Sequence, residues 1–227
     1  KLISDVAMHP HYAIVDPTLT MSCPKDLTVT VGLDTLTHSM EGYLNRIQDE
    51  GNEDINKRAL MSLELVFRWL KIAAENPEDY TARKMMSIAS LLGGTVIGGK
   101  RFKGTAGPHM NSFSWAETIP HGKSTGIMMP YYIAYYGENE VVQEKLEPIA
   151  DMLGCEKGDK IGLNVAQAML DWYKDMGFPT KISDIDGWKS EYKEKALKDA
   201  AENKMKLEAM PNPVPLGKVD ETIGPVL

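Results

Sequence analysis

Two segments of the chain bring together residue types that bind metal ions. The segment from Gly104 to Pro130 contains His109 and His121, and each of these histidines stands beside a proline, which places both at boundaries of secondary structure. An earlier segment, GLDTLTHSMEGYL, contains Asp34 and His38 four residues apart within a helical pattern. That spacing puts the two side chains on one face of a helix. The sequence therefore offers one carboxylate and three imidazoles as candidate metal ligands.

This set of ligands suits Zn²⁺, Fe²⁺ or a similar divalent ion and leaves the site with a net positive charge. An alcohol oxygen bound there would become more acidic, as metal-bound water does, and its C–H hydrogen would leave more easily as hydride. A nicotinamide is the usual acceptor of that hydride. From the residues alone, a second interpretation stays open, in which these side chains bind no metal. An Asp–His pair on a helix is often a surface pair, and a buried histidine is more often satisfied by a hydrogen bond.

The elements that must position these residues are predominantly helical. Residues 24–227 predict one all-helical domain, in which Pro24 suits the first turn of a helix and Gly32 marks either a break or a close approach of a neighbouring element. Apolar periodicity predicts further helices over residues 52–76, 77–99, 124–136, 141–153, 165–176 and 188–207. Before them, Tyr12–Val15 forms a short apolar run closed by Asp16-Pro17, which predicts a strand within a leader of residues 1–23.

The composition is that of an ordinary globular protein and limits the classes of molecule that the chain could bind. The 227 residues carry a net charge of -7 with 43% hydrophobic and 25% charged residues. An acidic chain argues against nucleic acid and against anionic membranes, which both need a basic face. No stretch approaches the ~20 apolar residues of a membrane span. Cys23 and Cys155 have no metal-type spacing, so we expect reduced thiols and a cytoplasmic location.

Four motifs then resemble a known family. The segments AIVDPTLT at 13–20, GLDTLTHSMEGYL at 32–44, GPHMNSFSWAETIPHG at 107–122 and MMPYY at 128–132 occur in the same order in the C-terminal part of the iron-dependent (group III) alcohol dehydrogenases. The resemblance covers roughly residues 3–222. It implies the helical, metal-binding domain of a fold like that of dehydroquinate synthase.

The resemblance also implies a site. It makes Asp34, His38, His109 and His121 the four metal ligands, with Fe²⁺ as the expected ion and Zn²⁺ or another divalent metal as alternatives. It places the DPTLT segment beside the cofactor, NAD or NADP, so that Leu19 and Thr20 become candidate nucleotide contacts. The expected substrate is a small alcohol or its aldehyde, and a homodimer is a candidate assembly.

Two departures from the family pattern matter. Many members have a second histidine four residues after the third ligand, near the nicotinamide, whereas this chain has Phe113, which we expect to shape the cofactor pocket without relaying protons. The interval from His109 to His121 is also two residues shorter than in many relatives. The second departure is the absence of a glycine-rich phosphate loop, since Gly93-Gly94 lies in an apolar helical pattern.

The missing phosphate loop and the lack of an initiator methionine give one expectation: residues 1–23 are what remains of a preceding nucleotide-binding domain. Such a chain would bind metal but would not turn over by itself. Two alternatives remain. One is a metal-assisted hydrolase or lyase, whose general base would have to be Glu41 or Glu117, although a solvated helix charge and a loop carboxylate are their ordinary roles. The other is a non-catalytic helical metal-binding module.

Overall fold

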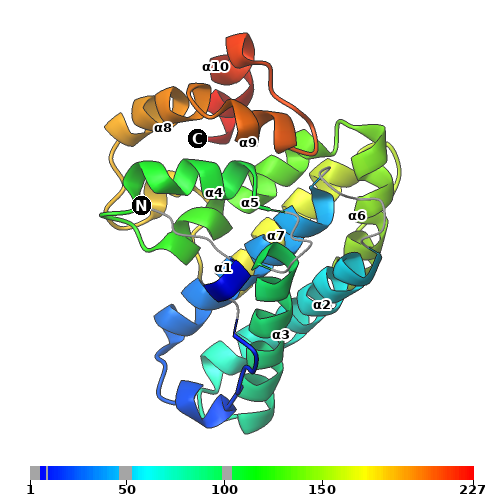
Figure 1. The fold of residues 1–227 in the computed structure, drawn as a ribbon, viewed down its shortest axis with the longest axis vertical. Helices are drawn as coiled ribbons and strands as arrows, with labels where there is room; N and C mark the ends of the chain where they lie inside the picture. The colour runs from blue at the N-terminus through cyan, green and yellow to red at the C-terminus, as the bar shows by residue number, and fades with distance from the viewer. Residues whose placement is uncertain (1–5, 9, 46–52, 99–103) are drawn as a thin grey trace.

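The computed structural model describes residues 6–8, 10–45, 53–98 and 104–227, and within these ranges the regular structure is entirely helical (Figure 1). The α-helices are α1 (Lys25–Leu44), α2 (Glu53–Glu75), α3 (Tyr80–Gly98), α4 (Gly107–Ser112), α5 (His121–Tyr136), α6 (Glu140–Leu153), α7 (Ile161–Asp175), α8 (Glu191–Ala201), α9 (Lys204–Ala209) and α10 (Val219–Ile223). Short 3-10 helices cover Val6–Met8, Pro17–Thr20, Phe113–Trp115, Ile182–Asp184, Leu216–Lys218 and Gly224–Val226.

The predicted helices are found, with differences at their ends. The helix expected from Pro77 begins at Tyr80, because the side chain of Asp79 accepts a hydrogen bond from the backbone N–H of Ala82 at 3.0 Å and caps the first turn. The helix expected over residues 188–207 is divided into α8 and α9, and the side chain of Asn203 accepts from the N–H of Lys206 to start the second piece. Residues 52 and 99 lie outside the described part of the chain.

The predicted strand at Tyr12–Val15 is wrong. These residues are extended but belong to no ladder, and the described residues contain no strand with which they could pair. Tyr12 is 91% exposed and Ile14 is 95% exposed. An extended apolar segment becomes a strand only when a neighbouring strand satisfies its backbone N–H and C=O groups. The run of apolar residues was therefore insufficient evidence for this element.

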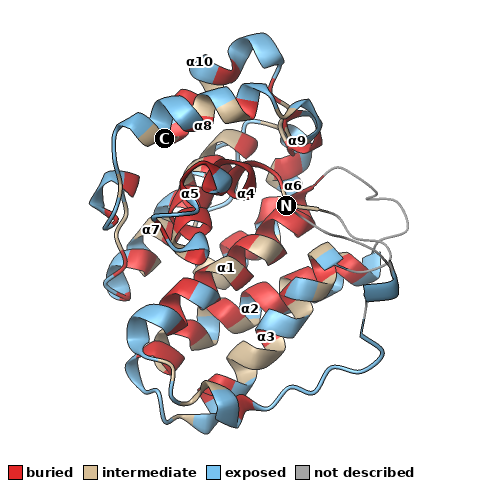
Figure 2. Ribbon diagram, turned by 60° about the vertical axis from the view of Figure 1, so that its left-hand side comes forward, coloured by how far each residue is buried: buried red, intermediate tan, exposed pale blue. Residues whose placement is uncertain are grey.

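Helix α1 is the centre of the fold and packs against α2, α3 and α5. Between Gly32 and Leu44, every residue except Asp34 and His38 is buried, so this helix is covered on nearly all sides (Figure 2). Gly32 permits a close approach and does not break the helix, since a Cβ there would lie 2.2 Å from Cδ1 of Leu70 on α2. The two incompletely buried positions on an otherwise buried stretch are both candidate metal ligands.

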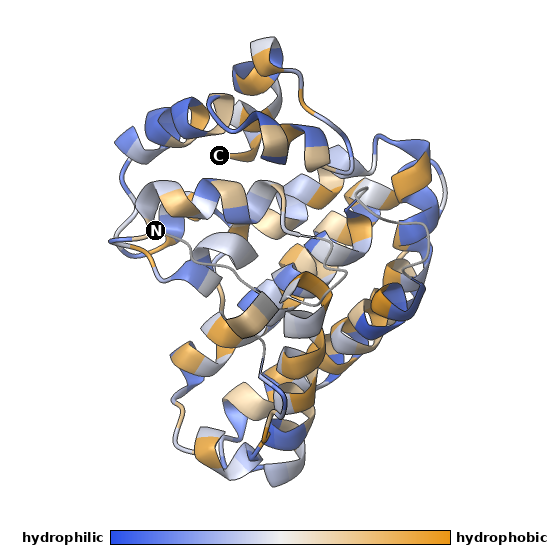
Figure 3. Ribbon diagram, viewed as in Figure 1, coloured by the Kyte–Doolittle hydropathy of each residue, from blue (hydrophilic) through white to orange (hydrophobic). Residues whose placement is uncertain are grey.

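The C-terminal helices form a cap over the short helix α4. Both α8 and α9 pack against α4, and α10 packs against α8 (Figure 1). Hydrophilic residues predominate along α8, whereas α3 presents mainly hydrophobic and small residues (Figure 3). Among the described residues, no helix combines the length and the apolar character that crossing a bilayer requires.

Candidate metal centre

Three helices bring the four predicted ligands together. Asp34 and His38 lie one turn apart on α1, His109 lies in α4, and His121 is the first residue of α5. One ligand atom from each side chain lies within 4.8 Å of the corresponding atoms of the other three. The distances from Oδ1 of Asp34 to Nε2 of His38, His109 and His121 are 3.8, 3.7 and 3.5 Å.

These separations fit ligands arranged around one ion better than hydrogen bonds between the ligands. An N–H···O bond normally spans about 2.7–3.2 Å, which is shorter than all three distances. Ligand atoms bound at about 2.1 Å in a tetrahedron lie about 3.4 Å from one another. The Nε2 atom of His109 gives the sharpest observation, because it is buried and has no hydrogen-bond partner among the residues that the structure describes. A buried polar atom without a partner is costly unless a ligand satisfies it.

Burial favours the neutral form, which is the form that binds a metal, in two of the three histidines. Burial lowers the pKa of His38 to about 4, although the nearby Asp34 carboxylate acts in the opposite direction. Burial also lowers the pKa of His121, with Asp34 again opposing it. The rings of His38 and His109 stack at 4.6 Å between centroids, an arrangement that would be unfavourable for two imidazolium ions. At neutral pH, His38 and His121 therefore keep the lone pairs that a metal would need.

Glu41 is the functional residue that sequence reasoning assigned wrongly. It was expected to be a solvated helix charge, but it is 1% exposed. Its Oε1 accepts from the backbone N–H of Ala106 at 2.7 Å, and its Oε2 pairs with Nδ1 of His109. With the Nδ1 proton directed to the carboxylate, Nε2 of His109 is left with its lone pair facing the other ligands. The available signal was its position three residues after His38, on the same helix face. Glu117, the other candidate base, is exposed.

Two further contacts orient the remaining ligands. The hydroxyl of Thr125 on α5 donates to Oδ1 of Asp34 at 3.3 Å, and Ser112 Oγ lies 3.3 Å from Nδ1 of His121. Helix α5 can approach α1 this closely because residue 122 is glycine, and a Cβ there would lie 2.1 Å from the carbonyl oxygen of Thr30. The Pro-His-Gly sequence therefore starts a helix, supplies a candidate ligand and permits the close contact in three consecutive residues.

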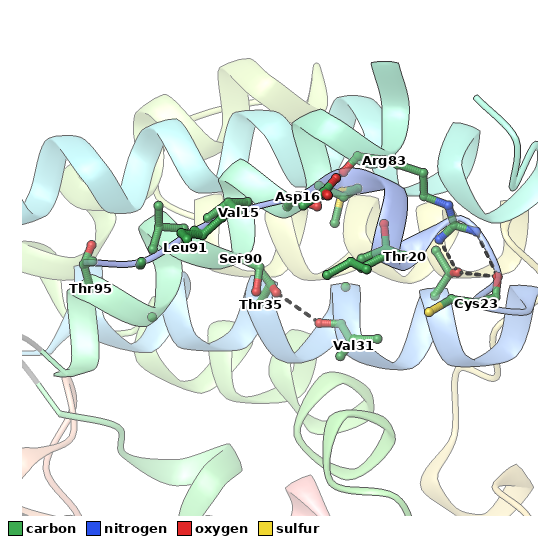
Figure 4. Close-up of a pocket in the computed structure, with 18 of the residues that line it drawn as sticks. Val15, Asp16, Thr20, Cys23, Val31, Thr35, Arg83, Ser90, Leu91 and Thr95 are labelled. Atoms are coloured by element: carbon green, nitrogen blue, oxygen red, sulfur yellow. Dashed lines mark hydrogen bonds between the residues drawn. The ribbon is translucent and has the colours of Figure 1, made fainter. Parts of the chain in front are cut away.

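The candidate cofactor residues are not brought together: Leu19 and Thr20 line a groove beside α1, whereas Phe113 lies next to His121. Leu19 and Thr20 belong to the 3-10 helix Pro17–Thr20, which Asp16 caps by accepting from the N–H of Thr18 at 2.9 Å. Both line a groove of about 1000 Å³ between residues 10–23, α1 and α3 (Figure 4). The four metal-ligand candidates do not line this groove, although Thr35, next to Asp34, does. Phe113 is 64% exposed, and its ring centroid lies 6.2 Å from that of His121.

Arg83 fixes one end of the groove. Its guanidinium donates to the carbonyl oxygen of Cys23 at 2.9 Å, to the hydroxyl of Thr28 at 2.7 Å and to the carbonyl oxygen of Pro77 at 3.0 Å (Figure 4). These bonds connect the segment before α1 to the start of α3. The buried Arg83 side chain therefore holds the end of the segment that carries Leu19 and Thr20, at Cys23, against the first turn of α1.

Comparison with known proteins points to one protein family. The family model described as the C-terminal part of the Fe-containing alcohol dehydrogenase family matches residues 28–222. The long-chain-alcohol dehydrogenase 1 of Geobacillus thermodenitrificans is 28% identical over 223 residues, which cover 92% of this chain and 53% of that protein. The NADH-dependent butanol dehydrogenase A of Clostridium acetobutylicum is 25% identical over 78% of this chain and 46% of that protein. The chain thus spans about half the length of these relatives.

A solved structure shares the fold. The crystal structure of an archaeal halo-thermophilic alcohol dehydrogenase from a Red Sea brine pool superposes with a TM-score of 0.83 at 22% identity. The match covers 96% of this chain and 55% of that protein. At this level of identity the likeness concerns the fold, and it supports the predicted helical domain.

Proposed function

The chain belongs to the Fe-containing alcohol dehydrogenase family, and we propose that it is the metal- and substrate-binding part of an enzyme that transfers a hydride between an alcohol or aldehyde and NAD or NADP. The observation that carries this proposal is the buried Nε2 of His109, which has no hydrogen-bond partner within the described ranges and lies near three other potential ligands. A bound divalent ion, Fe²⁺ or alternatively Zn²⁺, supplies Lewis-acid polarisation of the substrate oxygen. Asp34, His38, His109 and His121 would hold it.

The side chains at and around the proposed ion have separate roles in binding and polarising the substrate. Asp34 is the one anionic ligand, so the loaded site keeps a net positive charge that favours a developing negative charge on a substrate oxygen. Glu41 holds His109 in the required tautomer. Phe113, exposed beside His121, provides an apolar wall where a small alkyl group of the substrate would rest. The Geobacillus and Clostridium relatives are named for alcohol substrates, which supports this class of compound.

The nicotinamide cofactor requires residues outside the metal cluster. We propose that Leu19 and Thr20 contact it and that residues 1–23 connect to a nucleotide-binding domain of a longer protein. The relatives are about twice as long as this chain, and the name of the Clostridium relative specifies NADH. The 227-residue chain would then bind the metal without catalysing turnover. Alcohol-dependent formation of NAD(P)H by this chain alone would contradict that expectation.

The use of the same four ligands for hydrolysis has less support. Such a reaction needs a carboxylate free to act as a general base on water. Glu41 accepts from Ala106 and pairs with His109, so both of its oxygens are engaged. Glu117 is an exposed loop residue. Alcohol oxidation releases a proton together with the hydride, and polarisation of the alcohol oxygen by the metal would make that proton acidic enough to pass to solvent water.

The metal site is tested first. The purified chain is stripped with a chelator, titrated anaerobically with Fe²⁺, Co²⁺ or Zn²⁺, and its metal content is measured after desalting. We expect one ion per chain, loss of the ion in His121→Ala, and full binding in the control His11→Ala, which changes an exposed histidine outside the cluster. Equal binding by the His121→Ala variant would refute the assignment.

The reaction is tested in the product of the complete coding region by following NAD(P)⁺ reduction with butan-1-ol and propane-1,3-diol.

A further inference from the structure

Lys206 on α9 occupies an unusual position for a lysine. Its ammonium group turns inward and donates two hydrogen bonds to one residue, at 2.7 Å to the carbonyl oxygen of Thr105 and at 2.6 Å to the Thr105 hydroxyl. Burial lowers the pKa of Lys206, and the charge of Glu41 acts in the opposite direction. Holding a half-buried ammonium group against neutral partners alone is unfavourable, so a nearby carboxylate offsets part of that cost.

Thr105 belongs to the segment that leads into α4. The next residue, Ala106, donates its N–H to Glu41 Oε1 at 2.7 Å, and the preceding Gly104 accepts from the side-chain amide of Asn45 at 3.1 Å. Residues 104–106 are therefore bonded to α1 on one side and to α9 on the other. This segment ends at Ala106, the residue directly before α4, the helix that carries His109.

A continuous series of contacts joins α9 to the metal cluster. Lys206 holds Thr105, the adjacent Ala106 holds one oxygen of Glu41, and the other oxygen of Glu41 holds Nδ1 of His109. Displacing Thr105 would move the Ala106 N–H away from Glu41. The carboxylate would then lose the bond that fixes its orientation toward the imidazole.

We propose that Lys206 is a positioning residue for the metal centre, which acts through Thr105, Ala106 and Glu41 and makes metal binding depend on the C-terminal helices. The proposal rests on the proposed function, because it requires the four ligands to bind an ion. It assigns a role at the metal centre to a residue more than 80 positions beyond the last ligand in the sequence.

The test is a titration of the metal-free chain with Co²⁺, whose visible absorption reports the geometry of its ligands. Lys206→Met keeps the length of the side chain and removes its donors. We expect its dissociation constant for Co²⁺ to rise about tenfold, as for other residues that orient a metal ligand, and its absorption bands to change. The control Lys204→Met changes a lysine of the same helix that is exposed and paired with Glu208 at 3.6 Å, and it should match the parent.

Two further variants separate positioning from general stabilisation. Lys206→Arg retains charge and donors and should bind Co²⁺ more tightly than Lys206→Met. Thr105→Val removes the hydroxyl acceptor but keeps the carbonyl, so it should weaken binding by a smaller factor, and it decides the question if Lys206→Met does not fold. All titrations are made below the unfolding transition, with helicity checked by circular dichroism.

The outcomes distinguish this proposal from the one on which it rests. A parent chain that binds no Co²⁺ would refute the metal site and this role of Lys206 with it. A parent chain that binds Co²⁺, together with a Lys206→Met variant of unchanged affinity and spectrum, would refute the role of Lys206 alone. An arginine variant as weak as the methionine variant would also count against it.

Discussion

Glu41 and His109 form a buried carboxylate–imidazole pair: the glutamate is 1% exposed, the histidine is 4% exposed, and Oε2 of one contacts Nδ1 of the other. The pair determines which nitrogen of His109 carries the proton. Nδ1 donates to the carboxylate, so Nε2 keeps the lone pair that a metal needs. A residue outside the four proposed ligands would therefore control how one of them binds the ion.

The first prediction concerns this pair. Glu41→Gln preserves the shape of the side chain and an acceptor for the Ala106 N–H, but it turns an NH₂ group toward Nδ1 of His109. The imidazole would then protonate Nε2 and lose its ligand lone pair. We expect metal affinity to fall about 10- to 100-fold, measured by calorimetric titration with Zn²⁺. Glu64→Gln, at an exposed position on α2, is the control. An unchanged affinity in Glu41→Gln would rule out this role.

The second prediction compares two ligands in the metal-free chain. His109→Ala leaves Glu41 buried without its partner and should lower the free energy of unfolding by about 2–4 kcal/mol. The side chain of His121 is 40% exposed, so His121→Ala should cost less than about 1 kcal/mol. Both variants should lose the metal. Urea unfolding in the presence of a chelator measures the difference, and equal destabilisation would contradict the assigned burial of the two residues.

The third prediction concerns the approach of α5 to α1. Gly122→Ala would place a methyl group 2.1 Å from the carbonyl oxygen of Thr30 and 3.0 Å from Cβ of Asp34. The helices must then separate, which should destabilise the fold by about 2 kcal/mol and weaken metal binding. Gly94→Ala is the matched control, because nothing lies within 4 Å of a Cβ there, and it should be neutral or stabilising by up to about 1 kcal/mol. Thermal unfolding and Co²⁺ titration of both variants test this; a Gly122→Ala variant as stable as the parent would contradict it.

The fourth prediction concerns acid stability without metal. The pKa of His38 is lowered to about 4 in the folded chain, below the 6.5 of a free histidine. The unfolded chain therefore binds this proton more readily, so the stability contribution is complete above pH 6.5 and is lost as the pH falls toward 4. We expect His38→Gln to lessen the loss of unfolding free energy across this range by on the order of 2 kcal/mol. Parallel losses in the parent and the variant, both kept in chelator, would disprove the assignment.

Some features of this site could be predicted from the sequence, and others could not. Asp34 and His38 could be paired because helical periodicity alone places them on one face. The approach of His109 and His121 depends on the packing of α4 and α5, so it was predicted through a family resemblance and not from spacing. Glu41 was missed because its burial results from contacts with Ala106 and His109, more than 60 residues away in the sequence. The strand at Tyr12–Val15 failed for the corresponding reason: a strand requires a distant partner, and local composition does not reveal one.

Helix α1 contributes neighbouring residues to the metal cluster and to the groove. Asp34 belongs to the cluster, and its neighbour Thr35 lines the groove that also contains Leu19 and Thr20. Consecutive Cα atoms are about 3.8 Å apart, and this part of α1 is enclosed by other helices. The backbone of one enclosed helix would thus set the spacing between any molecule seated in the groove and any ion held by the cluster. If one reactant were bound at the ion and the other in the groove, the two would be aligned with each other without a hinge motion within the described residues.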